Sequence, residues 1–520
     1  MTELFVPLDR LLSCGGDARL SIDPASGVNA YGCRPFPCPD TTSFSSSTAT
    51  PISERAYDRV SDARESLMRS AVAIGLDEAF DARIESIRER LKFYLRLSYV
   101  DIVFSPSGSD SQLQALFLAR ALLGARLTTV IVAADQTGSG TVDTARGYHF
   151  SDVTANGIRV RKGEPIAGLA DGVTSVALPS FDAEGRVLSQ AENDSLVLGA
   201  IERSVAGGTK VLLQIMDSSK LGWRAPSDRC LDEISARWPD QVQVVVDACQ
   251  MRLGRPRLQS YLDRGYLVIV TGSKFFTGPA FSGALLVPAG LAQALDAATE
   301  VGSALHAYGS RSDWPMHWTR LRSRFPSRAN FGQWLRWEAA LEEIRAYYAV
   351  PDEFRLKALT AFGEGFTRMI ESSPSLYLLP LPKRPENRGN DDEELAQTTI
   401  FPFMIRRHDR VLSLNDCRKL HRALAQNARC ANQHERPEIA AKPCLVGQPV
   451  ALGDVERDPA AALRICASAR LVTETWSSDE DTARRNLQAE LGRVGGIAAR
   501  IEWSVTHLDN LNLTESCHEA

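Results

Sequence analysis

Seven short runs of apolar and β-branched residues punctuate the chain between about residues 80 and 290, and helical patterns separate them. The runs are VDIVF, TTVIVAA, VTSVALP, KVLLQIM, QVQVVVD, YLVIVTG and GALLVP. Runs that are apolar on both faces and alternate with helices are typical of a mostly parallel sheet covered by helices on both sides. Ligands bind such a sheet at the carboxyl ends of its strands, so the polar residues that follow the runs are candidates for a site.

Helical patterns flank this predicted sheet. Pro51 and the residues after it predict a helix over about 52–73, with the proline in the first turn, where its missing N–H is not needed. Residues 330–350 place tryptophan, leucine and isoleucine at three- and four-residue steps. This spacing predicts a long helix with one apolar face, which we expect to link two domains.

The C-terminal part contains the elements of a second, smaller domain. TTIFPFMI resembles a strand, a helix is predicted near 413–427, a loop around 428–452, and AALRICASARLV follows. The stretch at 380–395 is rich in proline and then in acidic residues, which predicts a solvated loop.

The length of 520 residues also favours two domains, because a single hydrophobic core stops growing at roughly 250 to 300 residues. We therefore expect an α/β fold with a large domain on a mostly parallel seven-stranded sheet and a smaller α+β C-terminal domain. The expected boundaries are 1–51 for an N-terminal arm, 52–318 for the large domain, and 319–520 for the linker helix and small domain.

Composition narrows the range of partners. The formal net charge of −5 shows no basic excess, so we expect no nucleic-acid partner. No run of about 20 apolar residues exists and the first residues carry acids, so we expect no membrane span, no signal peptide and a cytoplasmic protein. The ten cysteines form no CxxC pair or cysteine–histidine cluster, so we expect neither a disulfide framework nor a metal site.

Two strand ends carry residues with complementary chemistry. Asp247 ends the run QVQVVVD, and Lys274 follows the run YLVIVTG. We expect both at one edge of the sheet. A lysine amine forms an imine with an aldehyde, and a carboxylate keeps a pyridine nitrogen protonated, so the pair meets the two electronic requirements of pyridoxal phosphate.

The surrounding motifs resemble those of fold-type I pyridoxal-phosphate enzymes, in the class V aminotransferase branch that includes the cysteine desulfurases. Asp247-Ala248-Cys249-Gln250 matches the D-x-x-Q motif, and Thr271-Gly272-Ser273-Lys274 with Gly278-Pro279 matches the lysine motif; the likeness spans roughly 44–475. The resemblance implies a Schiff base at Lys274, a hydrogen bond from Gln250 to the cofactor's phenolic oxygen, and a phosphate contact from Thr271.

A phosphate site is predicted after the run VDIVF. Gly108-Ser109-Asp110 opens a helix pattern there, and small residues at a helix N-terminus let backbone N–H groups approach a dianion. Gly108 and Ser109 match the G-T-T or G-S-T loop of the resembled family, whereas Asp110 departs from it. Because an acid would repel a phosphate, we expect Asp110 to cap the helix or to point aside.

Two further loops bear on the cofactor. The first is the loop 135–141, which lacks the lysine of a P-loop. At this position the resembled family places a histidine against the cofactor ring, and Gln136 or Thr137 stands there instead. After the run KVLLQIM the family has an asparagine near the phenolic oxygen. The candidates here are Asp217, Ser218 and Ser219, with a slight preference for Ser218, and a plain hydrophilic turn is the alternative.

The resemblance also implies substrate-binding and dimer contacts. Arg464, in LRICASARLV, matches the arginine that holds the substrate carboxylate, a role suited to a planar, permanently charged fork. A homodimer with a shared active site is implied, with Ser327 or Arg328 reaching the neighbouring subunit's phosphate. Val446 stands where desulfurases have their nucleophilic cysteine, so we expect persulfide chemistry to be absent and Cys444 to be structural.

The expected activity is that of a PLP-dependent enzyme acting on an amino acid or amine, with class V aminotransferase-like transfer first. Elimination of a β substituent by a carbon–sulfur or related lyase is the second expectation, and an epimerase is a further outcome of the same chemistry. A non-catalytic scaffold that binds the cofactor is the third class, against which the retained lysine, aspartate and glutamine argue.

Overall fold

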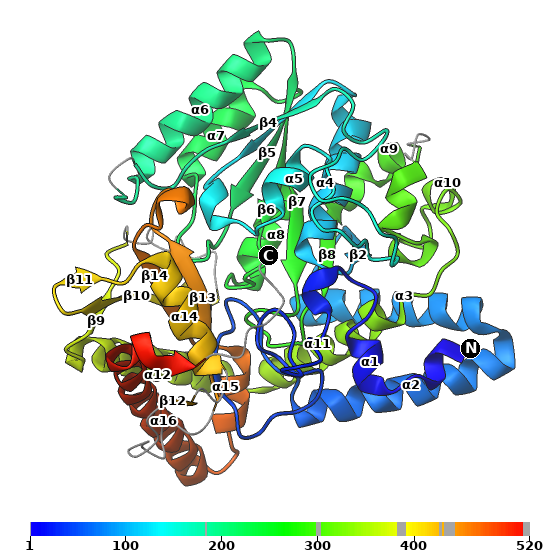
Figure 1. The fold of residues 1–520 in the computed structure, drawn as a ribbon. Coiled ribbons are helices and arrows are strands. Elements are labelled where there is room, and N and C mark those ends of the chain that lie inside the picture. The colour runs from blue at the N-terminus through cyan, green and yellow to red at the C-terminus, as the bar shows by residue number, and fades with distance from the viewer. Residues whose placement is uncertain are drawn as a thin grey trace.

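The computed structural model describes residues 2–182, 185–297, 303–381, 392–425, 429–430 and 443–512. Its large domain is built on a seven-stranded sheet in the order β2-β8-β7-β6-β5-β3-β4, which crosses the upper half of Figure 1. All seven predicted runs form its strands. These are β2 (Val100–Ser105), β3 (Leu127–Ile131), β4 (Val173–Ala177), β5 (Lys210–Met216), β6 (Val242–Asp247), β7 (Leu267–Thr271) and β8 (Gly283–Pro288). Only β8 runs antiparallel to its neighbours in this sheet, which confirms the predicted α/β fold class.

The sheet separates two hydrophobic cores because successive strand residues face opposite sides. Val103 packs into the core around α4 (Gly108–Leu123), whereas Ile102 and Phe104 pack into the core on the other side. Other helices that contact the sheet or lie beside it are α5 (Thr141–Ala145), α6 (Gln190–Ala206), α7 (Asp228–Arg237) and α8 (Arg255–Asp263). β4, at the edge, is only partly buried, unlike the inner strands.

Two predicted helices are present with changed details. The first is α2 (Glu54–Ile74), whose N-cap is Ser53, so Pro51 precedes the cap rather than lying in the first turn. The second is α11 (Phe331–Ala349), which is buried on nearly every side, whereas the periodicity predicted a single apolar face. Its buried charges are neutralised locally: Glu338, for example, pairs with arginines of α2 and α3 (Leu76–Leu95).

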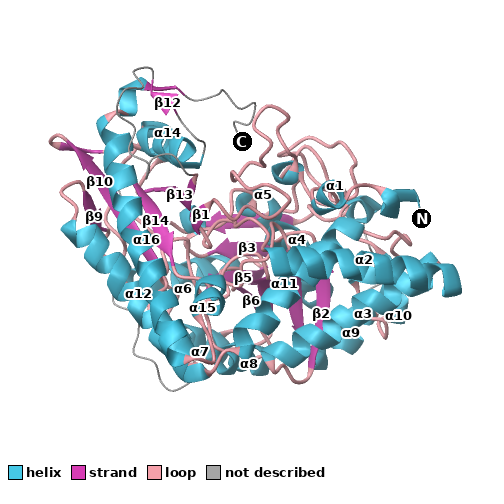
Figure 2. Cartoon of the chain, turned by 90° about the horizontal axis from the view of Figure 1, so that it is seen from below, coloured by secondary structure: helices cyan, strands magenta, loops and turns pink. Residues whose placement is uncertain are grey.

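A second sheet, in the order β1-β13-β14-β10-β11 with β9 beside β10, forms the core of the small domain. Its strands are β1 (Thr42–Phe44), β9 (Leu376–Leu378), β10 (Ile400–Arg407), β11 (Arg410–Val411), β13 (Cys444–Ala451) and β14 (Ala461–Cys466). Figure 2 shows α12 (Asp352–Ser372) and α16 (Glu480–Thr506) along one side of this sheet, with α14 (Leu414–Ala425) and α15 (Ala469–Thr475) near it. The remaining short elements are α1 (Leu8–Leu12), α9 (Ala292–Asp296), α10 (Thr319–Arg322), β12 (Arg429–Cys430) and β15 (Leu511–Asn512).

Two predicted loops of this part need correction. The loop expected over 428–452 contains strand β13, which pairs with β1 and β14; residues 431–442 lie outside the described part. Of the loop expected over 380–395, residues 382–391 lie outside the described part, and α13 (Glu393–Ala396) follows. Glu394 on α13 is buried in an ion pair with Arg355 at 2.8 Å, so this segment is not simply solvated.

The N-terminal arm joins both halves of the molecule. Its helix α1 packs against α11, and its strand β1 pairs in parallel with β13, so that Thr42 lies opposite Cys444. Residues 45–50, between β1 and α2, are all buried. The arm therefore belongs structurally to the small-domain sheet as well as to the large domain, and the three proposed domain boundaries stay predictions.

Two findings concern the described residues as a whole. None of the helices in these ranges is long and apolar enough to cross a bilayer. Eight of the cysteines within them form no disulfide with one another: Cys14, Cys33, Cys38, Cys230, Cys249, Cys417, Cys444 and Cys466.

Candidate active site

The predicted site residues lie along one edge of the large sheet, where its parallel strands end. Asp247 is the last residue of β6, and Thr271 ends β7 three residues before Lys274. Gly108 begins α4 just after β2, and Gln136 follows β3. Ser218 follows β5, and the charges of Asp247 and Lys274 influence each other, so this edge gathers the predicted groups.

Lys274 is the central basic group. Its Nζ donates to the backbone carbonyl of Thr48 in the arm. None of the ion pairs among the described residues includes Lys274, so its charge is not neutralised by a contacting carboxylate. Burial lowers the pKa of Lys274 to about 7, and the charge of Arg464 adds to this effect. A lowered pKa leaves more of the amine neutral near pH 7, which is the nucleophilic form.

Asp247 is the acid of the pair. It is 7% exposed, and its Oδ1 accepts a hydrogen bond of 3.1 Å from the backbone N–H of Cys249. Burial raises the pKa of Asp247, while that hydrogen bond and the charge of Lys274 act in the opposite direction. A buried carboxylate of this kind favours a neighbouring cationic group over water.

The N-terminus of α4 forms a cradle closed by its cap. Ser107 is the N-cap: its Oγ accepts from the Asp110 N–H at 3.3 Å and donates to Asp110 Oδ2 at 2.6 Å. Asp110 thus supports the cap rather than forming it, and burial raises its pKa to about 7, assisted by the charge of Asp17. A Cβ on Gly108 would lie 2.7 Å from Cys249 Sγ, so a larger residue here would force the Cys249 side chain to move.

Arg19 of the arm reaches the same cradle, a contact that the sequence did not suggest. Its guanidinium pairs with Asp17 through two contacts of 2.7 Å. Arg19 Nη2 lies 3.5 Å from the hydroxyl oxygens of both Ser107 and Ser109. The guanidinium also lies 4.7 Å from the ring centroid of Phe281, which fixes its position. The arm therefore adds a cation to the helix N-terminus at which a phosphate was predicted.

Several buried polar atoms around this edge have no hydrogen-bond partner among the described residues. They are both amide atoms of Gln136, the hydroxyl oxygens of Ser47 and Ser218, and Oε1 of Gln250. Gln250 Nε2 donates to the Ser47 carbonyl at 3.0 Å, so only its oxygen is left. Buried polar groups are nearly always paired because unpaired ones are costly. A group of unpaired polar atoms at the strand ends is therefore expected where a polar ligand supplies the missing hydrogen bonds.

Other predicted candidates have partners within the chain. The Thr271 hydroxyl donates to the Cys249 carbonyl at 2.7 Å, so its one proton is directed there; its phosphate contact stays a prediction. Asp217 accepts from Arg257 and from Tyr261 at 3.0 and 2.8 Å. Ser219 accepts from two backbone N–H groups of its own turn. Of the three residues considered after β5, Ser218 is thus the one with an unpaired hydroxyl.

Arg464 on β14 is a buried cation without a carboxylate partner among the described residues. It is 2% exposed, and it donates hydrogen bonds to neutral oxygens: the Gln448 carbonyl (2.8 and 3.1 Å), the Thr48 hydroxyl (3.0 Å) and the Lys220 carbonyl (3.3 Å). Burial lowers its pKa to about 10. A guanidinium held in this way stabilises an incoming anion, because binding supplies the missing counter-charge.

Three consecutive arm residues contact the site. The Ser46 hydroxyl accepts from Arg252 Nη2 at 2.8 Å, and the Ser47 carbonyl accepts from Gln250. Thr48 contacts both Lys274 and Arg464, through its carbonyl and its hydroxyl respectively. The sequence predicted an N-terminal arm over 1–51, and its serine-rich composition did not indicate these contacts.

The remaining candidates lie elsewhere. Ser327 donates to Asp77 at 2.8 Å and Arg328 to the Asn156 carbonyl at 2.6 Å, both at the surface, so the proposed contact with a second subunit stays a prediction. Cys444 and Val446 are buried on β13 rather than in a loop. Burial raises the pKa of Cys444 to about 11, which supports a structural role.

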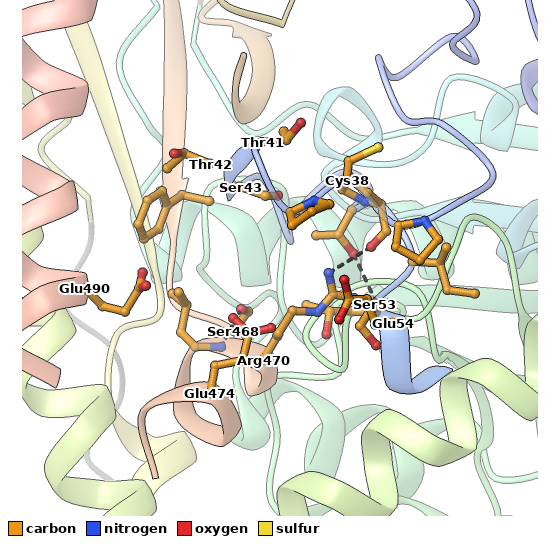
Figure 3. A pocket seen from close by; sticks show the side chains of 18 of the residues that line it. Cys38, Thr41, Thr42, Ser43, Ser53, Glu54, Ser468, Arg470, Glu474 and Glu490 are labelled. Atoms are coloured by element: carbon orange, nitrogen blue, oxygen red, sulfur yellow. Dashed lines mark hydrogen bonds between the residues drawn. The ribbon is translucent and has the colours of Figure 1, made fainter. Parts of the chain in front are cut away.

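A cavity of about 400 Å³ lies beside the arm but is lined by neither Lys274 nor Asp247. Figure 3 shows Thr41, Thr42 and Ser43 of the arm along one side and Ser468, Arg470 and Glu474 along the other. Arg470 is already bound to the carbonyls of Pro51 and Thr277 at 2.8 and 2.7 Å. The unpaired polar atoms and free charges at the strand ends make that edge, and not this cavity, the candidate active site.

Comparisons with known proteins give structural likenesses only. No family model matches the chain, and no curated protein matches it. Among solved structures, Catharanthus roseus tryptophan decarboxylase in complex with L-tryptophan is similar with a TM-score of 0.49 and 15% identity, over 87% of this chain and 83% of that one. The cystine C–S lyase C-DES with cysteine persulfide has a TM-score of 0.47 and 13% identity, over 88% and 98%. A phosphoserine aminotransferase from Cytophaga hutchinsonii has a TM-score of 0.45 and 11% identity, over 88% of this chain and 100% of that one.

Proposed function

We propose that the chain is a pyridoxal-phosphate-dependent enzyme that acts on an amino acid or amine through Lys274. The observation that carries the proposal is the meeting, at one sheet edge, of a half-buried lysine with a lowered pKa, a buried aspartate and a glycine-led helix N-terminus. The motifs around Lys274 and Asp247 led to the same cofactor from the sequence.

The residues at this edge fit the cofactor's functional groups. Gly108 and Ser109, with Arg19 above them, would hold the phosphate at the start of α4. Asp247 would face the ring nitrogen. The unpaired hydroxyl of Ser218 can donate to the phenolic oxygen, and the unpaired amide of Gln136 suits the ring face or its substituents. Gln250 Nε2 already donates to the Ser47 carbonyl, so the hydrogen bond expected from Gln250 to the phenolic oxygen stays a prediction. Ser218 and Gln136 thereby have partners of matching polarity, so these residues fit the cofactor.

When bound, pyridoxal phosphate supplies an aldehyde for a primary amine and a conjugated ring that accepts electrons. The chain's own residues perform the remaining tasks. Lys274, about half deprotonated near pH 7, would be the nucleophile toward the aldehyde and, when its amine is free again, a base beside the substrate's α-carbon. Arg464 orients the substrate by its carboxylate, and Asp247 holds a proton at the ring nitrogen.

Class V aminotransferase-like transfer is our first assignment within this proposal, supported by the motif resemblance. A lyase that eliminates a β substituent is the alternative, and the buried, unreactive state of Cys444 argues against persulfide chemistry as part of it. A homodimer belongs to the same proposal; the molar mass of the protein in solution tests it.

Absorption spectroscopy tests the cofactor assignment. Purified chain titrated with pyridoxal phosphate is expected to gain a visible absorption band that Lys274→Ala abolishes and Lys162→Ala, at an exposed lysine, retains. A wild-type protein that stays colourless, or an equal band in Lys274→Ala, would overturn the proposal. Incubation with a panel of amino acids then separates the reactions. Conversion of the cofactor to its amine form indicates transamination, release of keto acid and ammonia indicates elimination, and no turnover with cofactor bound indicates a scaffold.

A further inference from the structure

The turn after β5 presents a second lysine, Lys220, to the candidate active site. Ser219 and Trp223 close this turn through a backbone hydrogen bond of 2.8 Å, and the Ser219 hydroxyl accepts from the N–H groups of Leu221 and Trp223. Gly222 has a φ of +91°, and a Cβ added to it would lie only 3.2 Å from the Cβ of Ile400. A glycine at this position therefore lets the turn pass close to Ile400. The backbone of Lys220 is therefore held in place rather than free to swing.

Lys220 is a neighbour of Arg464 and Lys274. Arg464 Nη1 donates to the Lys220 carbonyl at 3.3 Å, which joins the turn directly to the predicted carboxylate-binding arginine. Burial lowers the pKa of Lys220 to about 8, and the charge of Arg464 contributes. Lys220 in turn contributes to the lowered pKa of Lys274. Three cations, of which Arg464 is buried and the two lysines are half-buried, are thus close enough to influence one another's charge.

The carboxylates that influence Lys220 do not pair with it. Asp135 and Asp247 both act on its charge, but no ion pair between described residues includes Lys220. Asp135 is bound by the N–H and hydroxyl of Ser180, and Asp247 accepts from Cys249. Arg464 likewise has no carboxylate partner among the residues that the structure describes. A buried cation beside a half-buried one, with no contacting carboxylate among the described residues, is costly unless anions bind to them.

We propose that Arg464 and Lys220 together select a substrate with two anionic groups. Arg464 takes the α-carboxylate as a planar fork, and Lys220 takes the acidic group at the end of the substrate side chain, be it a carboxylate, sulfonate or phosphate. This inference rests on the proposed function and names its substrate class, an acidic amino acid. It also gives a reason for a lysine at the apex of a turn that is otherwise built from buried and small residues.

Substitution of Lys220 tests the selection. For Lys220→Met, the ratio of kcat/KM for acidic amino acids to that for neutral amino acids of similar size should fall at least tenfold. The loss should come from KM rather than kcat, and Lys220→Arg should retain most of the preference because it keeps the charge. Lys210→Met, at the opposite end of β5, is the matched control. An unchanged ratio in Lys220→Met, with the cofactor bound and the substrates turned over, overturns the inference.

A second measurement needs neither the cofactor nor a variant. In the cofactor-free wild-type chain, succinate should protect Lys220 from acylation by an amine-reactive reagent more strongly than acetate does, as followed by peptide mass spectrometry. Exposed Lys162 should be acylated equally with either anion. Equal acylation of Lys220 with succinate and with acetate would contradict the inference. Because this readout is independent of pyridoxal phosphate, failure of the proposed cofactor and failure of the proposed substrate class are distinguishable.

Discussion

Replacing Lys274 by methionine should stabilise the cofactor-free protein while abolishing its proposed activity. Methionine keeps a long, flexible side chain but removes the charge. Lys274 is half-buried beside Arg464, and its Nζ donates a hydrogen bond to the carbonyl of Thr48. Folding therefore places this amine where its charged form is disfavoured, and the wild-type chain is less stable for it.

The size of the effect follows from the pKa. Burial and neighbouring cations lower the pKa of Lys274 from its ordinary 10.5 to about 7. A change of one in pKa corresponds to about 1.4 kcal/mol, so lowering the pKa from 10.5 to about 7 would cost the folded state about 5 kcal/mol. Because the side chain keeps some access to water and methionine loses the hydrogen bond to Thr48, we expect a gain in the free energy of unfolding of about 2–3 kcal/mol.

The sign of the pH dependence is fixed by the same shift. Below about pH 7 the amine is charged in both states, and the native state bears the full penalty. Between about pH 7 and 10.5 the native amine is neutral and the unfolded one is charged, so unfolding takes up a proton and the wild-type chain becomes more stable as the pH rises. The advantage of Lys274→Met should therefore be greatest below pH 7 and vanish toward pH 10.5.

Urea unfolding followed by tryptophan fluorescence measures this difference in protein freed of cofactor. The two chains should be compared at about pH 6.5, 8 and 9.5, with Lys162→Met, at an exposed lysine, as the control. A variant less stable than wild type at about pH 6.5, or an advantage that does not shrink as the pH rises, would refute the reasoning that Lys274 is destabilised by burial of its charge.

Three further changes test other parts of the site. Asp247→Asn should lower turnover by roughly a hundredfold or more, because an amide cannot hold the ring nitrogen's proton as a carboxylate does; steady-state kinetics on cofactor-saturated protein measure this, and near-normal kcat would contradict it. Gly108→Ala should weaken cofactor affinity about tenfold or more, since its Cβ would lie 2.7 Å from Cys249 Sγ, and the additional change Cys249→Ala should restore it in a fluorescence titration. Arg464→Met should raise KM for amino acids by roughly a hundredfold, as loss of a charge-assisted fork implies; a KM within threefold of wild type would exclude Arg464 from substrate binding.

The large sheet was predictable from sequence because each of its strands is a continuous apolar run, and Asp247 and Lys274 follow such runs directly. The contacts of the arm were not predictable in the same way. Thr48 and Lys274 are 226 positions apart, and nothing local to a serine-rich segment indicates which distant side chains it meets. Strand β13 was missed for a related reason, since CLVGQPVA contains glycine and proline and is held by pairing with β1 and β14 rather than by its own propensity.

Thr48 shows how the arm makes a region rich in buried cations tolerable. Its carbonyl accepts from Lys274 and its hydroxyl accepts from Arg464, so one residue places oxygen atoms against both charges. Neutral oxygens offset only part of the cost of burying a cation, whereas a carboxylate or phosphate offsets more. An anionic substrate that reaches Arg464 must therefore compete with Thr48, but it gains from a charge that the protein leaves uncompensated. Affinity for anions at this edge is thus set jointly by the arm, which provides neutral acceptors, and by the strands, which hold the cations in place.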